Sequence, residues 1–511
     1  MSESRTNNSI KNAATGIIYK LIGIFCPFII RTVMIRKLGA EYLGLNSLFT
    51  SILQMLSLSE LGIGNAMVYS MYKPIAEKDT KRVCALLSLY RKYYRYIGVV
   101  ILILGLVISP FLEYFIKGSY PADINIHVLY FIYLGNTVIS YFLFAYKKSI
   151  LDATQKVSIE NCIQTILTTI MYVLQIAALF FTRNYYVYIV FLPCTTFLVN
   201  IIRYVTVNKM YPQYVCSGTV EKGFIDDLKL KIKALIGHKI GANVIWFSDS
   251  IVISTFLGLN VLAIYSNYYY IMNAIIGLLA IVYNSILASV GNSLVTEKEE
   301  KNYLDFKNLN FGNTWIVAWC SICLVCMYQP FMELWMGKNL MFPMEIVVLF
   351  AVYFYTWMFN KVANTYMNAA GLWSEAFWKP YVSSIINLLL NIILVNIIGI
   401  AGVLISTIVA SVFIETPWES SVLHRCLFKR KAITYYKQLI VSVMFTAFCG
   451  GITYKICQLI MVDNLIGTLI IRLLICLSIP NIIFIVLFHN TEEFIYIISK
   501  LKRIVCRVSA K

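Results

Sequence analysis

The sequence predicts an all-α polytopic membrane protein with about 14 transmembrane helices, arranged as two six-helix lobes and two additional C-terminal helices. Two observations carry this prediction. Apolar stretches of about 20 residues, the length that crosses a bilayer as a helix, follow one another along nearly the whole chain. Charged residues make up only 13% of the 511 residues, about half of what soluble domains contain. The chain therefore has no room for a soluble catalytic domain.

The expected spans follow in order, and short polar connections separate them. They are 14–36, 44–71, 92–116, 123–146, 159–182, 186–208, 238–258, 262–294, 310–335, 344–370, 380–398, 401–423, 437–460 and 465–488. The connections expected outside are very short, while those expected inside are longer and charged. This pattern argues against a large extracytoplasmic domain.

Most of the 43 Lys and Arg residues fall on alternate connections and on the C-terminal tail. The positive-inside rule then places both termini in the cytoplasm and explains the net charge of +18 without nucleic-acid binding. The same basic connections fit anionic membrane lipids or a partner protein, although topology alone accounts for them. We expect no cleavable signal peptide, because residues 1–12 are polar and no small-residue cleavage site follows.

The two halves resemble each other weakly. Leu38 and Gly39, after the first span, have counterparts in Leu257 and Gly258 after the seventh, and similar offsets recur further along. Parallel repeats of this kind are found in transporters whose substrate site lies between two lobes. We therefore expect an N-terminal lobe at 1–225, a C-terminal lobe at 226–430, and two helices with a basic tail at 431–511.

Ionisable residues inside the spans mark candidate sites, because such groups normally face a partner or an aqueous cavity. Lys20 and Arg31 are eleven positions apart in the first span, so they lie on one face of a helix that Pro27 can bend. Two cations on one face suit an anionic substrate. The alternative is that each side chain reaches its nearer interface.

Three further regions carry candidate residues. Lys361 lies in the tenth span with Asn360, Asn364 and Asn368, a polar stripe at i, i+4 and i+8 that predicts either cavity lining or hydrogen bonds between helices. Asp249 in the seventh span is expected to be paired or titratable. Glu60 lies among small residues and has a coupling or a structural role.

The sequence gives no sign of a catalytic, metal or cofactor site. The 13 cysteines are scattered through apolar segments, as buried reduced thiols are. Cys320, Cys323 and Cys326 form C-x2-C-x2-C, but a ferredoxin-like run needs a fourth cysteine before its proline, and Gln329 precedes Pro330 instead. No Walker motif is present, so transport would draw on an ion gradient, the membrane potential or the substrate's own gradient.

Residues 11–95 contain a set of short motifs in a fixed order. Asn12 opens the set, followed by Arg31, Leu38-Gly39 and Leu43-Gly44-Leu45. The run from Leu56 to Gly64 and the run from Tyr72 to Ala76 complete it. This stretch resembles the N-terminal region of the bacterial Wzx-type polysaccharide flippases of the multidrug/oligosaccharidyl-lipid/polysaccharide (MOP) exporter superfamily. Beyond it the resemblance is fainter and extends to Asp249, Tyr265 and Gly371.

The resemblance implies two six-helix lobes around a central cavity, in the bacterial cytoplasmic membrane. It implies flipping of undecaprenyl-pyrophosphate-linked oligosaccharides for O-antigen, capsule or teichoic-type polysaccharides, alongside polysaccharide assembly proteins. On that basis Lys20, Arg31 and Lys361 would hold the pyrophosphate. Asp249 would bind H⁺ or Na⁺, or balance Arg31. A multidrug exporter of the same superfamily, a peptidoglycan-precursor flippase and a membrane glycan polymerase or ligase remain alternatives.

Overall fold

The computed structural model describes residues 5–57, 63–221, 223, 225, 245, 247–460 and 464–509. Helices account for nearly all of these residues, and none of them forms a strand. Eleven of the described helices are long and apolar enough to cross a membrane, or twelve if the bent pair α5 and α6 forms one span. The prediction of an all-α, multi-pass membrane protein is confirmed. The expected spans at 44–71 and 238–258 include residues outside the described ranges, so these helices give no test of the count of fourteen.

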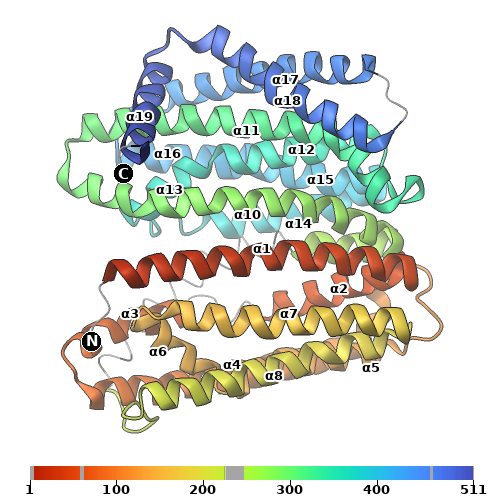
Figure 1. The fold of residues 1–511 in the computed structure, drawn as a ribbon, viewed down its shortest axis with the longest axis vertical. Helices are drawn as coiled ribbons and strands as arrows, with labels where there is room; N and C mark the ends of the chain where they lie inside the picture. The colour runs from red at the N-terminus through yellow and green to blue at the C-terminus, as the bar shows by residue number, and fades with distance from the viewer. Residues whose placement is uncertain are drawn as a thin grey trace. The chain divides into compact units, whose positions relative to one another are not determined.

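The chain divides into two compact units, residues 1–263 and 264–511, with the boundary inside α10 (Figure 1). The expected division at 225/226 and 430/431 stays a prediction. Each unit is described separately below.

Unit 1 is built from a series of labelled helices, short 3-10 turns and the helix Phe247–Leu257. Its labelled helices are α1 (Arg5–Lys37), α2 (Ala40–Leu56), α3 (Ile63–Ala76), α4 (Thr80–Ile108), α5 (Ile126–Phe142), α6 (Lys148–Ala153), α7 (Val157–Phe181) and α8 (Tyr185–Met210). α1 packs on α7, α7 on α8, α8 on α5, and α5 on α4. The α5–α6 pair bends by 48° near Phe144. The backbone of Phe144 has a φ of 51°, in the left-handed region that favours glycine.

Asn12 fixes the start of α7 against α1. Its side-chain amide donates to the carbonyl of Gln155 at 3.0 Å and accepts from the backbone N–H of Ser158 at 2.7 Å. Because the first backbone donors of a helix lack partners within it, this contact satisfies a group that would otherwise remain open. Asn12 therefore has a structural role in joining two helices that are far apart in the sequence.

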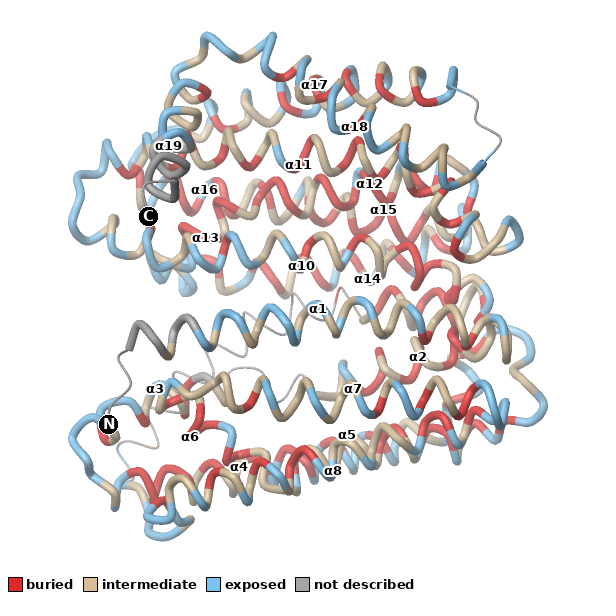
Figure 2. The backbone as a smooth tube through the Cα atoms, viewed as in Figure 1, coloured by how far each residue is buried: buried red, intermediate tan, exposed pale blue. Residues whose placement is uncertain are grey.

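Unit 2 contains the remaining helices. They are α10 (Leu259–Thr296), α11 (Glu299–Met336), α12 (Met344–Phe359), α13 (Lys361–Ala370), α14 (Lys379–Ile398), α15 (Ile400–Ala410), α16 (Thr416–Cys426), α17 (Ile433–Leu459), α18 (Leu465–Phe488) and α19 (Glu492–Ser509). α11 packs against α12, α17, α18 and α19, and α14 packs against α15. Buried residues are concentrated in α11, α12 and α15 (Figure 2). A π-helical turn, Ser411–Glu415, joins α15 to α16.

Residues with positive φ recur at matching places in the two units. Gly39 corresponds to Gly258, and Gly118 corresponds to Gly337 at the same offset along the chain. Further along, Gln155 corresponds to Gly371 and Arg183 to Gly399, again with one offset common to both pairs. The two residues of each pair lie at the ends of helices that correspond in the two units. The weak sequence similarity between the halves therefore corresponds to a repeated order of helices and turns.

Candidate functional site

Unit 1 contains a buried ion pair between α7 and α8. Arg203 donates from Nε and Nη2 to the two carboxylate oxygens of Glu160, at 2.8 and 2.5 Å. The two side chains are only 6% and 3% exposed. Asn200 accepts from Nη1 of Arg203, and Gln164 donates to Glu160 at 3.1 Å. Both charges therefore have the bidentate geometry and additional partners that a buried pair requires.

A polar cavity of about 440 Å³ adjoins this pair within unit 1. Its volume falls in the range of about 300–1,000 Å³ that is usual for small-molecule sites. Its lining combines two cations with amide, hydroxyl and phenol groups, including Tyr94, Lys148, Gln164, Tyr172, Asn200 and Arg203. Such groups hydrogen-bond hydroxyl-rich or anionic ligands.

The predicted residues Lys20 and Arg31 both lie on α1, and both are half-buried. The helix is continuous through Pro27, so the spacing of eleven positions corresponds to about 16 Å along its axis. Arg31 is close enough to Tyr188 of α8 to interact with it electrostatically. Asp249 lies on the helix Phe247–Leu257 of the same unit and is 1% exposed. Glu60 lies outside the described residues.

Unit 2 contains a second buried ion pair, between α14 and α16. Lys379 donates to Oε1 of Glu419 at 2.5 Å, and the two side chains are 8% and 5% exposed. The predicted residue Asn364 donates to the same oxygen at 3.2 Å. Lys361 interacts electrostatically with both members of the pair. One end of the predicted polar stripe therefore lies beside an ion pair.

Asn360 occupies the junction of α12 and α13 and is held from two sides. Its amide donates to Thr416 of α16, and its carbonyl oxygen accepts from Tyr435 of α17 at 2.8 Å. Asn360 is 7% exposed. In this conformation both ends of its side chain are used within the protein, as in the hydrogen-bonding alternative that the sequence left open.

The residues Glu160, Arg203, Lys379 and Glu419 were not among the candidates that the sequence singled out. Glu160 and Lys379 lie in the first turn of their helices, where a charge is usually interfacial. The sequence contained one signal that could have identified these four residues, namely their opposite charges on consecutive spans. In each unit, two consecutive spans carry opposite charges at a similar separation in sequence, at 160 and 203 and at 379 and 419.

No protein-family model matches the sequence, and no curated protein matches it. Solved structures do share the fold. An inward-closed structure of the lipid II flippase MurJ has a TM-score of 0.63 and 16% identity, covering 94% of this chain and 99% of its own. An inward-facing multidrug resistance transporter of the MATE family has a TM-score of 0.58 and 13% identity, covering 77% and 93%. A eukaryotic MATE transporter has a TM-score of 0.56 and 12% identity, covering 85% and 98%.

This chain shares the fold of these solved transporter structures. The MurJ comparison covers 94% of this chain. The helices α17, α18 and α19 together run from Ile433 to Ser509. This stretch is longer than the part of the chain that the MurJ comparison leaves uncovered. The similarity to the flippase must therefore include a large part of the C-terminal helices.

Proposed function

We propose that this protein flips undecaprenyl-pyrophosphate-linked oligosaccharides across the bacterial cytoplasmic membrane for the synthesis of a surface polysaccharide. The observation that carries the proposal is the similarity to a lipid II flippase over nearly the whole chain, C-terminal helices included. Lipid II is itself a lipid-linked precursor, so the fold is compatible with cargo of this class. The motifs between Asn12 and Ala76 favour the polysaccharide branch over the cell-wall branch.

The charges of α1 support an anionic cargo. Lys20 and Arg31 are farther apart along α1 than the length of a pyrophosphate group. They would therefore bind the pyrophosphate one after the other, or one would bind the pyrophosphate and the other the neighbouring sugar. Charge-assisted hydrogen bonds from Arg to phosphate oxygens are short and directional. In this proposal Lys361 assists, and the prenyl tail stays in lipid while the head group crosses.

The polar cavity beside Arg203 supports binding of the sugar portion. Its volume of about 440 Å³ and its phenol, amide and hydroxyl groups suit a sugar residue better than a flat apolar cation. We infer that this cavity accepts part of the head group in one state of the transport cycle. The inner connections, with both termini cytoplasmic, would face the enzymes that assemble the repeat unit.

The decisive experiment deletes the gene and measures polyprenyl-pyrophosphate-linked glycans on each leaflet by mass spectrometry. Accumulation on the cytoplasmic face, with loss of surface polysaccharide, supports flipping and identifies the cargo. Accumulation on the outer face instead indicates a polymerase or ligase. Unchanged lipid-linked glycans contradict the proposal.

Complementation of the deletion strain tests the residues. Arg31→Glu should abolish surface polysaccharide and Arg31→Lys should retain part of it, at equal protein levels in the membrane. Normal polysaccharide with Arg31→Glu would exclude a phosphate grip at this position. A coupling role for Asp249 predicts a transport rate that depends on pH or Na⁺; independence from both would leave Asp249 as a counter-charge only.

Multidrug export is the second candidate, because MATE transporters share the fold, one of them with a TM-score of 0.58. The two MATE comparisons cover 77% and 85% of this chain, less than the flippase covers. Drug-resistance profiles of the deletion strain separate the two functions. Increased drug sensitivity with unchanged glycans would favour the exporter.

A further inference from the structure

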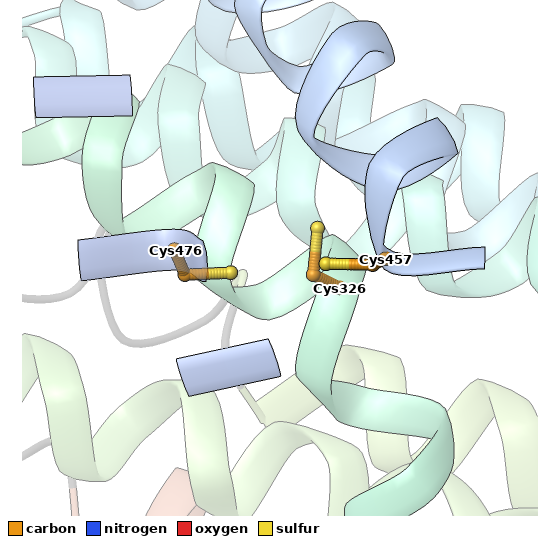
Figure 3. Close-up of side chains that lie close together, drawn as sticks. All are labelled: Cys326, Cys457 and Cys476. Atoms are coloured by element: carbon orange, nitrogen blue, oxygen red, sulfur yellow. The ribbon is translucent and has the colours of Figure 1, made fainter. Parts of the chain in front are cut away.

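Three buried cysteines converge in unit 2 from three different helices. Cys326 of α11, Cys457 of α17 and Cys476 of α18 have no exposed surface. Their sulfur atoms all lie within 4.8 Å of one another, and Figure 3 shows the three side chains gathered where these helices meet. The sequence spacing showed only the C-x2-C-x2-C run on α11. The fold adds two thiols from helices that come much later in the chain.

The separation of the sulfur atoms suits a shared metal ion. In a tetrahedral site with Zn–S bonds of about 2.3 Å, the sulfur atoms are about 3.8 Å apart. The observed upper limit of 4.8 Å is close enough to this value that small side-chain rotations supply the closure. The thiols are free in this structure, and thiolate is the ligand class that selects soft metal ions.

A fourth thiol lies close by on the same face of α11. Cys323 precedes Cys326 by three positions, so both side chains lie on one side of the helix. The thiols of Cys323 and Cys476 are within hydrogen-bonding reach. The C-x2-C spacing on α11 is also one of the ligand spacings found in structural zinc sites.

Arg472 supplies an independent observation. It lies one turn before Cys476 on α18, and its Nη1 donates to the carbonyl oxygen of Cys326 at 3.0 Å. Its Nε is buried and has no hydrogen-bond partner among the described residues. This buried N–H beside three thiols lacks an acceptor, and a metal-bound thiolate would provide one.

We propose that Cys326, Cys457 and Cys476 bind one thiophilic metal ion, with Arg472 as the positioning residue that balances its charge. On binding, Zn²⁺ replaces the three thiol protons, which leave to solvent. Three thiolate charges then offset the two positive charges of the ion and the one of Arg472. This neutral set makes Zn²⁺ the expected ion ahead of Cu⁺, and Cys323 is placed to complete four-coordination as a neutral thiol.

The site would join α17 and α18 to α11, inside the core where these helices already pack. Because the ligands come from three separate helices, the ion binds the folded arrangement and not the separated segments. Its binding free energy would therefore add to the stability of the C-terminal helices. This proposal is independent of the proposed transport function.

Metal content tests the proposal directly. The full-length protein in nanodiscs is reduced with a phosphine, stripped with a chelator, loaded with Zn²⁺ and desalted, and zinc is then measured by plasma mass spectrometry. We expect one zinc per chain, and its loss with Cys326→Ser, Cys457→Ser or Cys476→Ser. Cys449→Ser is the matched control, because Cys449 is equally buried on α17 but lies outside the three-thiol set. It should retain the zinc.

Two further measurements keep the test decisive if a variant fails to fold. X-ray absorption of the loaded wild-type protein should show sulfur ligands at about 2.3 Å. Arg472→Gln should weaken zinc binding by about 10- to 100-fold, the usual effect of removing a supporting group. Stoichiometric Cu⁺ in place of Zn²⁺ would support the thiolate site with the other ion. Wild-type protein that retains no metal, or a disulfide between two of the three cysteines in the native membrane, would overturn it.

Discussion

The two units place a buried ion pair between corresponding helices, but with the signs reversed. Arg203 in α8 corresponds to Glu419 in α16, at the same offset along the chain that relates Gln155 to Gly371. Their partners, Glu160 and Lys379, lie in the first turns of α7 and α14, about one helical turn from strict equivalence. The acid is on the earlier helix in unit 1 and on the later helix in unit 2.

This reversal shows what the position requires. Inside a low-dielectric core, a lone charge costs several kcal/mol, whereas either orientation of a matched pair satisfies both groups. The repeated architecture therefore needs opposite charges on the two helices and not a particular residue on either. The pairs differ in geometry, however. Arg203 engages both oxygens of Glu160, while Lys379 contacts one oxygen of Glu419 and leaves room for Asn364.

The largest expected effect comes from breaking one pair. Lys379→Met leaves Glu419 buried close to a second, partly buried acid, Glu415, and should lower the free energy of unfolding by about 3–5 kcal/mol. Adding Glu419→Gln should recover most of this loss, because the remaining amide is neutral and can still accept from Asn364. Thermal unfolding of the protein in nanodiscs measures both variants. Lys301→Met, which removes an exposed partner of Glu297, is the control and should have no measurable effect. A double variant as unstable as the single one would contradict the pairing.

The second effect tests the difference in geometry. Arg203→Lys keeps the charge in unit 1 but cannot engage both oxygens of Glu160 and Asn200 together. We expect a loss of about 1.5–3 kcal/mol, the usual contribution of a hydrogen bond to a charged group. Lys73→Arg is the control, because its pair with Glu77 is exposed and should leave stability unchanged. Equal stability of Arg203→Lys and the wild type would show that only the charge matters here.

The third prediction exchanges residues between the units at a left-handed turn. Gly371 has φ 70° and ψ 24°, and a Cβ added there would meet no atom within 4 Å. Gly371→Gln, which introduces the residue of unit 1, should cost about 1 kcal/mol from backbone strain alone. Gln155→Gly should have a smaller effect of opposite sign. Gly23→Ala, inside α1 with open space around it, should stabilise the protein slightly. These variants are compared by thermal unfolding. A large loss with Gly371→Gln would mean that contacts, and not φ, determine this position.

The sequence predicted the helices well because hydropathy and length decide them. The span expected at 465–488 coincides with α18, and the span at 380–398 begins only one position after α14 does. α4 begins at Thr80, well before the expected start at 92, because its first turns carry charged residues such as Lys81 and Arg82. A helix that extends beyond the apolar segment is not visible in hydropathy.

The ion pairs and the thiol cluster were beyond prediction for a different reason. Each depends on the rotation of the helices about their axes and on their relative positions along those axes, and hydropathy carries no information about either. The π-helical turn Ser411–Glu415 precedes α16 and changes the rotation of Glu419 about the helix axis relative to the residues of α15. Cys326 meets Cys457 and Cys476 because α17 and α18 pack on α11, a contact between segments far apart in the chain. Asn360 and Asn364 were found because they share a face of one segment, and Lys361 because it is a charge inside an apolar span.

The smallest effect concerns α19, for which unit 1 has no described counterpart. Glu493 forms an ion pair with Lys307 of α11 at 2.5 Å. Burial raises the pKa of Glu493, but the hydrogen bond and charge of Lys307 outweigh it and hold the pKa below its usual value. A carboxylate with a lowered folded-state pKa stabilises the fold above its unfolded-state pKa, and this contribution is lost as the pH falls through the folded-state value. Because both side chains are partly exposed, the gain is below about 1 kcal/mol. Backbone hydrogen exchange in α19, corrected for the intrinsic pH dependence of the exchange rate, should therefore accelerate slightly as the pH falls through the acidic range where carboxylates titrate. Glu493→Gln should remove that acceleration, and an unaltered pH response in the variant would exclude the pair as its cause.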